Sequence, residues 1–219
     1  MKRIPLLASL FLSCLLLFTP VSHSQSPFDG CKAEGLGKKT RNNPAGNLPD
    51  RFKELNRLKN RDTAPRARDI DESITLTEIL KPENDGEFEN SQGAEITGYV
   101  AYVYWGEKRE SVNCSREDLR DIHIAIVCHP KYREDKSQWM FAEITPRFQD
   151  RLGDNDSLQY LETKWVRLRG WMFYDAQHKG NARTVNPRGK AIWRATPWEI
   201  HPLTSFAVLD GAPRGDLCP

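Results

Sequence analysis

The feature that most constrains the fold is a series of strand-like runs that begins near residue 95. The runs are rich in β-branched and aromatic residues, and several alternate apolar with polar residues, the period of two that is typical of half-buried strands. A polar, helix-compatible stretch follows the third run, at about 147 to 162. The five runs lie at 95–105, 121–128, 138–145, 165–174 and 198–209, with a break expected in the last one at Pro202. This order predicts a mainly β protein.

Three strands, one helix and two further strands is the order of the OB-fold, a five-stranded Greek-key barrel. We therefore expect an OB-fold-like barrel over residues 94–210, with one helix between strands 3 and 4, and a C-terminal tail over 211–219. In such barrels the loops after strands 1 and 4 flank the usual binding face. These loops are 106–120 and 175–197 here, and loops longer than about 12 to 15 residues in a compact domain are often functional. The sequence thus predicts a site beside the two loops.

The N-terminus has the anatomy of a secretory signal peptide over residues 1–24. Lys2 and Arg3 precede a long apolar stretch, and small residues stand at the expected cleavage site. A lipoprotein signal at Cys14 is disfavoured, because the apolar run continues beyond that cysteine. No later run approaches the roughly 20 apolar residues of a membrane helix. We expect a mature chain that begins at Gln25 and is secreted or periplasmic.

Residues 25–93 form the expected N-terminal extension, which is partly helical. Residues 31–68 contain eleven Lys or Arg and four Asp or Glu, a net charge of +7, whereas residues 69–93 contain eight acids and one lysine, a net charge of −7. The two halves either neutralise each other or leave a basic arm free for an anionic partner. The basic half contains apolar residues at helical spacing, with Asn47 or Asp50 available as a cap. The apolar residues of that helix are Leu48, Phe52, Leu55 and Leu58. The segment "KPENDGEFENSQG" at 81–93 is typical of an acidic linker or surface loop and not of a packed element.

Four cysteines follow the signal peptide, and an even number in an exported chain predicts disulfides. Of the three possible connectivities we favour Cys31 with Cys218 and Cys114 with Cys128, because the first pair would tie both termini to the domain. Free buried thiols are the alternative. The spacing C-x-x-C is absent, which argues against a zinc-cysteine site.

Three acid-histidine pairs stand where the expected barrel would bring them to one end. Two pairs have their members two positions apart on a strand, so each pair shares a face, and that face is less apolar than the opposite one. The pairs are Asp121 with His123 in "DIHI", Asp175 with His178 in "FYDAQH", and Glu199 with His201 in "WEIHP". We therefore expect one polar site beside the two long loops, on the outer or loop-end surface.

These elements carry a resemblance to a known group of proteins. The segments "DIHIAI", "RGWMFYDAQH" and "WRATPWEIHP" resemble those of uncharacterised exported bacterial proteins with an OB-like barrel, over residues 95–208. The resemblance includes the Asp-x-His, Asp-x-x-His and Glu-x-His-Pro elements. It implies a shared site at these positions and leaves the chemistry of that site open.

Three kinds of function fit the acid-histidine pairs. In the first, His123, His178 and His201 bind a divalent metal such as zinc, with the carboxylates as further ligands, as orienting partners or as a base. Such a metal would activate water, as in a metal-dependent phosphodiesterase or nuclease-like hydrolase. In the second, the pairs are hydrogen-bonded anchors that stabilise the barrel. No residue is assigned a catalytic role from the sequence.

The third function, and the leading expectation, is ligand or partner binding outside the cytoplasm. OB-folds bind oligosaccharides, oligonucleotides and peptides with aromatic and basic side chains. Without Lys2 and Arg3 the formal net charge of +2 falls to about zero, which disfavours a nucleic-acid ligand and favours a saccharide, peptide or protein. The candidate binding residues are Trp139, Trp171, Arg167 and Arg169, with Phe141 and Phe173 as further aromatic candidates.

Overall fold

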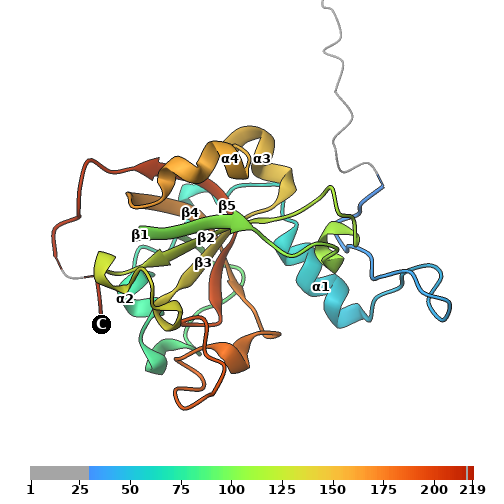
Figure 1. The fold of residues 1–219 in the computed structure, drawn as a ribbon, viewed down its shortest axis with the longest axis horizontal. Coiled ribbons are helices and arrows are strands. Elements are labelled where there is room, and N and C mark those ends of the chain that lie inside the picture. Colours follow the sequence, from blue (N-terminus) through green and yellow to red (C-terminus); the bar gives the residue numbers. More distant parts are fainter. Residues whose placement is uncertain (1–29, 216) are drawn as a thin grey trace, which may run out of the picture.

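The computed structural model describes residues 30–215 and 217–219 (Figure 1). The predicted signal peptide lies outside the described residues. No helix in the described part of the chain combines the length and the apolar character needed to cross a membrane. The α-helices are α1 (Asp50–Lys59), α2 (Leu76–Ile79), α3 (Pro146–Leu152) and α4 (Asn155–Leu158). The strands are β1 (Gly93–Trp105), β2 (Ile122–Val127), β3 (Met140–Ile144), β4 (Trp165–Tyr174) and β5 (Trp198–Val208). Single turns of 3-10 helix are η1 (Ala67–Asp69), η2 (Pro82–Asn84), η3 (Ser111–Asn113), η4 (Pro130–Tyr132), η5 (Lys136–Gln138), η6 (Gln159–Leu161) and η7 (Lys179–Asn181).

The five strands form a closed mixed barrel in the order β1-β2-β3-β5-β4, in which β4 returns to β1. All pairings are antiparallel except that of β3 with β5, which is parallel. The prediction of a five-stranded barrel is therefore confirmed, and β4 has the predicted limits. In Figure 1, α3 and α4 lie together over one end of the barrel and α1 lies to its side.

The predicted break at Pro202 is wrong, because β5 runs through this residue as one strand. The pairing of β4 with β5 instead shifts register on either side of Gly170. A Cβ on Gly170 would lie 2.3 Å from the carbonyl oxygen of Pro202. The irregularity is thus accommodated by a residue without a side chain, which allows the two backbones to approach.

The barrel interior is filled by one face of each strand, and this fixes which side chains point outward. Ile122, Ile124 and Ile126 of β2 are fully buried in the main core cluster, with Ile200 from β5. Because side chains alternate along a strand, His123 and the neighbours of Ile200 project from the outer side of the barrel. The site described below is built on this outer side.

The segment before the barrel packs against it more closely than the predicted extension and linker imply. Ile74, Leu76, Ile79 and Leu80 of the α2 region are buried within the main core cluster. In the predicted linker, the ring of Phe88 packs edge-on against Trp198 at 5.6 Å, and the backbone oxygen of Asp85 accepts a hydrogen bond from the indole of Trp198 at 3.0 Å. The acidic segment therefore packs on the barrel through a few of its residues, such as Phe88, and does not act as a free linker.

The two predicted helical segments are present with different details. Helix α1 occupies the predicted place, but its N-cap is Pro49 and makes no side-chain cap, so neither Asn47 nor Asp50 serves as one. The single helix expected at 147–162 is divided into short helices. Gly153, with φ of 111°, ends α3, and the side chain of Asp154 caps α4.

Two disulfides are present, but the predicted pairing is wrong. The bonds are Cys31–Cys114 and Cys128–Cys218, with Cα separations of 5.6 and 5.1 Å. Cys31 lies next to the loop after β1, because residues that follow Cys31 in sequence form backbone hydrogen bonds with that loop. One of these bonds runs from Leu36 N to Ser111 O at 2.9 Å. Cys114 is thereby brought to Cys31 and not to Cys128. The end of β2 instead holds the C-terminal tail.

Candidate functional site

A cavity of about 600 Å³ lies on the outer side of the barrel. Its lining includes residues of β2, β3 and β5, and it is covered by α1 and by the two long loops, 106–120 and 175–197. Aromatic rings and charged groups alternate in its lining. The aromatic lining residues are Tyr104, Trp105, Phe141, Phe173 and Trp193.

Strand register places the lining side chains next to one another. His123 lies opposite Tyr104 of β1 and opposite Glu143 of β3. Residues directly opposite in neighbouring strands project from the same face. In the next row, Glu199 of β5 lies between Phe141 of β3 and Phe173 of β4. The outer side of the barrel thus carries histidine, glutamate and phenylalanine where the inner side carries aliphatic residues.

Arg194 holds one side of the site. Its side chain is 1% exposed, and it donates to Asp175 Oδ2 at 2.8 Å, to Glu199 Oε1 at 2.7 Å and to the backbone oxygen of Thr196 at 2.7 Å. His178 Nδ1 lies 2.6 Å from the same oxygen of Asp175. Asp175 has a pKa below its ordinary value, because the hydrogen bond from His178 and the neighbouring positive charges outweigh the effect of burial. This side of the site is a complete ion-pair network.

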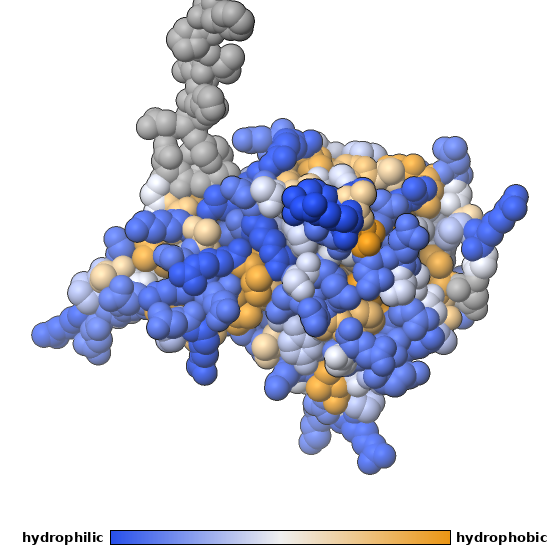
Figure 2. Space-filling view, turned by 180° about the vertical axis from the view of Figure 1, so that it is seen from behind, coloured by the Kyte–Doolittle hydropathy of each residue, from blue (hydrophilic) through white to orange (hydrophobic). Residues whose placement is uncertain are grey.

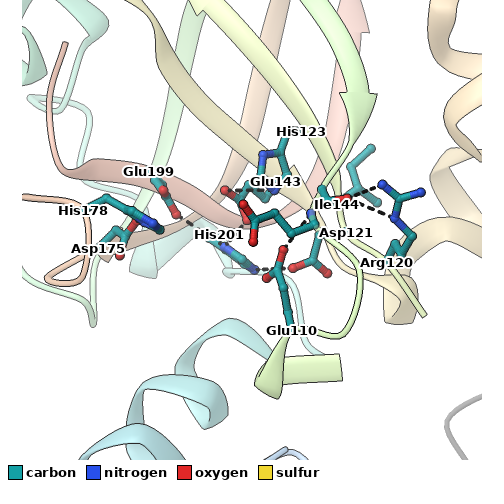
Figure 3. A network of polar contacts seen from close by, with 12 residues as sticks. Glu110, Arg120, Asp121, His123, Glu143, Ile144, Asp175, His178, Glu199 and His201 are labelled. Atoms are coloured by element: carbon teal, nitrogen blue, oxygen red, sulfur yellow. Dashed lines mark hydrogen bonds and ion pairs between the residues drawn. The ribbon is translucent and has the colours of Figure 1, made fainter. Parts of the chain in front are cut away.

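His201 is at the centre of the other side, and the nearby carboxylates converge on its ring (Figure 3). Its Nδ1 lies 2.9 Å from Glu143 Oε2 and 3.5 Å from Glu199 Oε2, and its Nε2 lies 3.9 Å from Asp121 Oδ2. Glu143 Oε1 lies 3.5 Å from Nε2 of His123. His201 and Asp121 are fully buried. Glu143 therefore connects the two strand histidines, and Glu199 connects the centre to Arg194.

The mutual charges of these buried groups govern their protonation. Burial would lower the pKa of His201, but the charge and hydrogen bond of Glu143 raise it to about 9. Burial would raise the pKa of Glu143, but the charges of His123 and His201 hold it well below its usual range. The pKa of Asp121 is raised by burial, with His201 acting against the shift.

Lys59 and Glu110 face this centre from the covering segments. Burial would lower the pKa of Lys59, but the surrounding carboxylates, Glu143 first among them, raise it above its ordinary value. Burial, aided by the negative charges of Asp121 and Glu143, raises the pKa of Glu110 to about 8. At neutral pH the cavity therefore contains a charged lysine from α1 and a protonated glutamic acid from the loop after β1.

The structure brings the predicted acid-histidine residues into one network, but with different partners. His123 contacts Glu143 and not Asp121, and the nearest carboxylate to His201 is again that of Glu143. His178 keeps its predicted partner Asp175, and His201 keeps Glu199 as a second, more distant carboxylate at 3.5 Å. His123 instead reaches across to Glu143 of the neighbouring strand.

The three histidines predicted as metal ligands do not converge on one ion. Within the described part of the chain, the residues whose donor atoms lie within 4.8 Å of one another are Asp121, Glu143 and His201. His178 is held away from them by Asp175, and its ring packs against Trp193 at 5.3 Å. The described residues whose donor atoms could share one ion are thus two carboxylates and one imidazole, and not the three predicted histidines.

The four predicted binding residues lie outside the cavity lining. Trp139 is 6% exposed, and its indole donates to the backbone oxygen of Arg133. Trp171 donates to Thr63 O at 2.8 Å. Arg167 lies 3.6 Å from Glu95, and Arg169 donates to Pro65 O at 3.0 Å. Trp139, Trp171 and Arg169 thus fasten a loop or the N-terminal segment to the barrel, whereas Arg167 pairs with a residue of the neighbouring strand β1. The further candidates Phe141 and Phe173 do line the cavity.

Sequence reasoning missed four charged residues of the site, Lys59, Glu110, Glu143 and Arg194. A signal was available for Glu143, which interrupts the apolar run "WMFAEI" at a position that faces outward. Arg194 stands five residues before Glu199, within a segment already noted for its resemblance. Lys59 and Glu110 gave no signal, because they reach the cavity only through the packing of α1 and of the loop after β1.

Comparisons of the chain with protein-family models, with curated proteins and with solved structures give no match. The function must therefore be inferred from the residues of the site.

Proposed function

We propose that this protein is an exported binding protein whose cavity takes a small ligand rich in hydrogen-bond donors, with an amino sugar as the best-fitting chemical class. The observation that carries the proposal is the cavity of about 600 Å³, lined by carboxylates and aromatic rings. Ligand sites usually have volumes of roughly 300 to 1,000 Å³ and combine apolar walls with a few well-placed polar groups.

Two features support a ligand that presents hydroxyl or amino groups. Glu143, Asp175 and Glu199 all line the cavity, and ionised carboxylates act only as acceptors. A ligand with hydroxyl or amino donors and an apolar face would match both these carboxylates and the aromatic rings beside them.

The barrel itself supports this placement. We infer that it is of the OB type, because its strand order is 1-2-3-5-4, β3 and β5 pair in parallel, and short helices connect β3 to β4. In that fold the binding face lies on strands 2 and 3, between the loops after strands 1 and 4. The cavity lies there. The resemblance to exported bacterial OB-like proteins stays a prediction.

Export is supported by the two disulfides, since such bonds persist mainly in oxidising compartments. A small ligand is favoured over a protein partner on the face shown in Figure 2, where hydrophilic residues predominate and hydrophobic ones are scattered. Protein docking sites are more often marked by contiguous apolar patches.

The test is saturation-transfer NMR and calorimetry with glucosamine, glucose and glycine. Glucose has the ring and hydroxyl groups of glucosamine without its amino group, and glycine has an amino group without the sugar ring. We expect glucosamine to bind, and Tyr104→Ala to weaken it about fivefold or more, the equivalent of roughly 1 kcal/mol for a lost aromatic contact. Tyr160→Ala is the matched control, because Tyr160 is 57% exposed and lies outside the cavity. Failure of all three probes to bind, or equal effects of the two tyrosine substitutions, would refute the proposal.

A metal-dependent hydrolase is the second candidate, and one observation favours it. Asp121, Glu143 and His201 could hold an ion beside a cavity large enough for a substrate. A metal with an open coordination position activates water for attack on a phosphodiester. Hydrolysis of bis(p-nitrophenyl) phosphate that requires added Zn²⁺ or Mn²⁺ and is lost in Asp121→Asn would favour this function over simple binding.

A further inference from the structure

We propose that Asp121, Glu143 and His201 form a binding site for a divalent transition-metal ion, Zn²⁺ or Mn²⁺, beside the cavity. Each residue offers one donor atom, and these atoms all lie within 4.8 Å of one another. Asp121 precedes β2, while Glu143 belongs to β3 and His201 to β5. Glu143 and His201 are thus held by neighbouring barrel strands, and Asp121 by its position directly before β2.

Two buried atoms of this cluster face each other without a hydrogen bond. Asp121 Oδ2 and His201 Nε2 are 3.9 Å apart, and neither atom has a hydrogen-bond partner elsewhere in the described residues. Both side chains are fully buried, so bulk water does not reach them. A buried polar atom without a partner is costly, and an ion or an ordered water is the usual explanation.

The gap between these two atoms fits a bridging ion. A separation of 3.9 Å is too long for a hydrogen bond. Two ligands of one tetrahedral zinc ion, each about 2.0 to 2.2 Å from the metal, lie roughly 3.3 to 3.6 Å apart. The observed separation is a few tenths of an ångström longer, so a small closing movement of the two side chains would complete the site.

The opposite side of the imidazole is arranged as in metal sites. His201 Nδ1 faces Glu199 Oε2 at 3.5 Å, and Glu199 is in turn held by Arg194 at 2.7 Å. Glu143 Oε2 lies 2.9 Å from the same nitrogen, so Glu143 binds the ion only when its carboxylate turns away from Nδ1. In metal sites the second ring nitrogen commonly faces a carboxylate, which fixes the ring and the nitrogen that binds the ion. Here the carboxylates turn Nε2 toward Asp121.

The charge of the cluster also favours a cation. Asp121 is a fully buried carboxylate whose one hydrogen bond within the described residues comes from the neutral amide of Asn113, at 3.2 Å. The nearest group that can carry a positive charge is His201, whose Nε2 lies 3.9 Å from Asp121 Oδ2, and a bound metal ion would replace the proton on that nitrogen. Two carboxylates and one imidazole suit Zn²⁺ and Mn²⁺, which accept both oxygen and nitrogen ligands. Glu143 also lines the cavity, which gives the ion a route of entry.

The test is elemental analysis of untagged protein that has been stripped with a chelator, incubated with Zn²⁺ or Mn²⁺ and separated from unbound ion. We expect near-stoichiometric metal in the wild type and at least a tenfold loss in Asp121→Asn and His201→Gln. Asp121→Asn keeps the shape of the side chain and an oxygen for the bond from Asn113. His178→Gln is the matched control, because it replaces a histidine of the same cavity that lies outside the cluster and should retain the metal.

A wild type without metal, variants that keep it, or a His178→Gln protein that loses it would each overturn the proposal. If a variant fails to fold, the metal site is tested by the Tm of the stripped wild-type protein with and without added metal. At a metal concentration 100 times the Kd, we expect its Tm to rise by about 5 °C or more. An unchanged Tm would contradict the site. This outcome is separate from the proposed function, since the sugar probes are tested on stripped protein as well.

Discussion

Replacing Arg194 with methionine should destabilise the protein more than any single change at its surface. Arg194 is 1% exposed and compensates two buried carboxylates, those of Asp175 and Glu199, which are 5% and 2% exposed. Removing one partner of a buried ion pair costs about 3 to 5 kcal/mol, because the remaining charge cannot be solvated. Since 1 kcal/mol corresponds to roughly 2 to 4 °C for a chain of 150 to 250 residues, Tm should fall by about 6 to 20 °C.

The assay is thermal and urea unfolding of Arg194→Met beside two comparison proteins. The triple variant with Asp175→Asn and Glu199→Gln removes all three charges and should recover much of the lost stability, since an uncharged cluster of similar volume is often as stable as a buried ion pair. Arg57→Met breaks an exposed ion pair and should leave Tm almost unchanged. A loss below about 1 kcal/mol in Arg194→Met, or a triple variant less stable than the single one, would refute this account of the network.

Two further predictions concern stability. The double variant Cys128→Ser/Cys218→Ser opens a bond between residues 90 positions apart and should lose about 4 to 5 kcal/mol on chain-entropy grounds, measured by urea unfolding; a loss under about 1 kcal/mol would contradict that bond. The hydrogen bond and charge of Asp175 raise the pKa of His178 above 6.5, so their contact stabilises the fold fully below about pH 6.5 and is lost as the pH rises through the raised pKa. The Tm difference between wild type and His178→Gln should therefore shrink from pH 6 to pH 9, and a difference that grows would show the opposite linkage.

The fold was predictable to the extent that its signals are local. Alternation in "DIHIAIVC" identifies β2 and assigns His123 to the outer side, and the β-rich runs give five strands in the right order. The prediction of a break at Pro202 was wrong. Proline has no backbone N–H for pairing with a neighbouring strand, and it was therefore taken as the end of the strand. The irregularity is instead absorbed at Gly170 of the partner strand, which the sequence of β5 does not show.

The site was predictable in its location but not in its pairings. Acids and histidines near the starts of β2 and β5 do gather, but each histidine on these strands meets Glu143 from the strand between them. Cross-strand partners depend on register, which a single strand does not specify. Lys59 reaches the cavity only because the loop after β1 and the Cys31–Cys114 bond dock the segment around α1 there. Such long-range contacts have no counterpart in local sequence.

The most direct test of the proposed metal site beside the cavity is anomalous diffraction from crystals grown with Mn²⁺ or Zn²⁺. The account predicts a peak between Asp121 Oδ2 and His201 Nε2, with Glu143 as the third ligand. A map without that peak, in which Asp121 and His201 have closed from 3.9 Å to hydrogen-bond distance, would contradict it. The acid-histidine residues would then be anchors of the barrel.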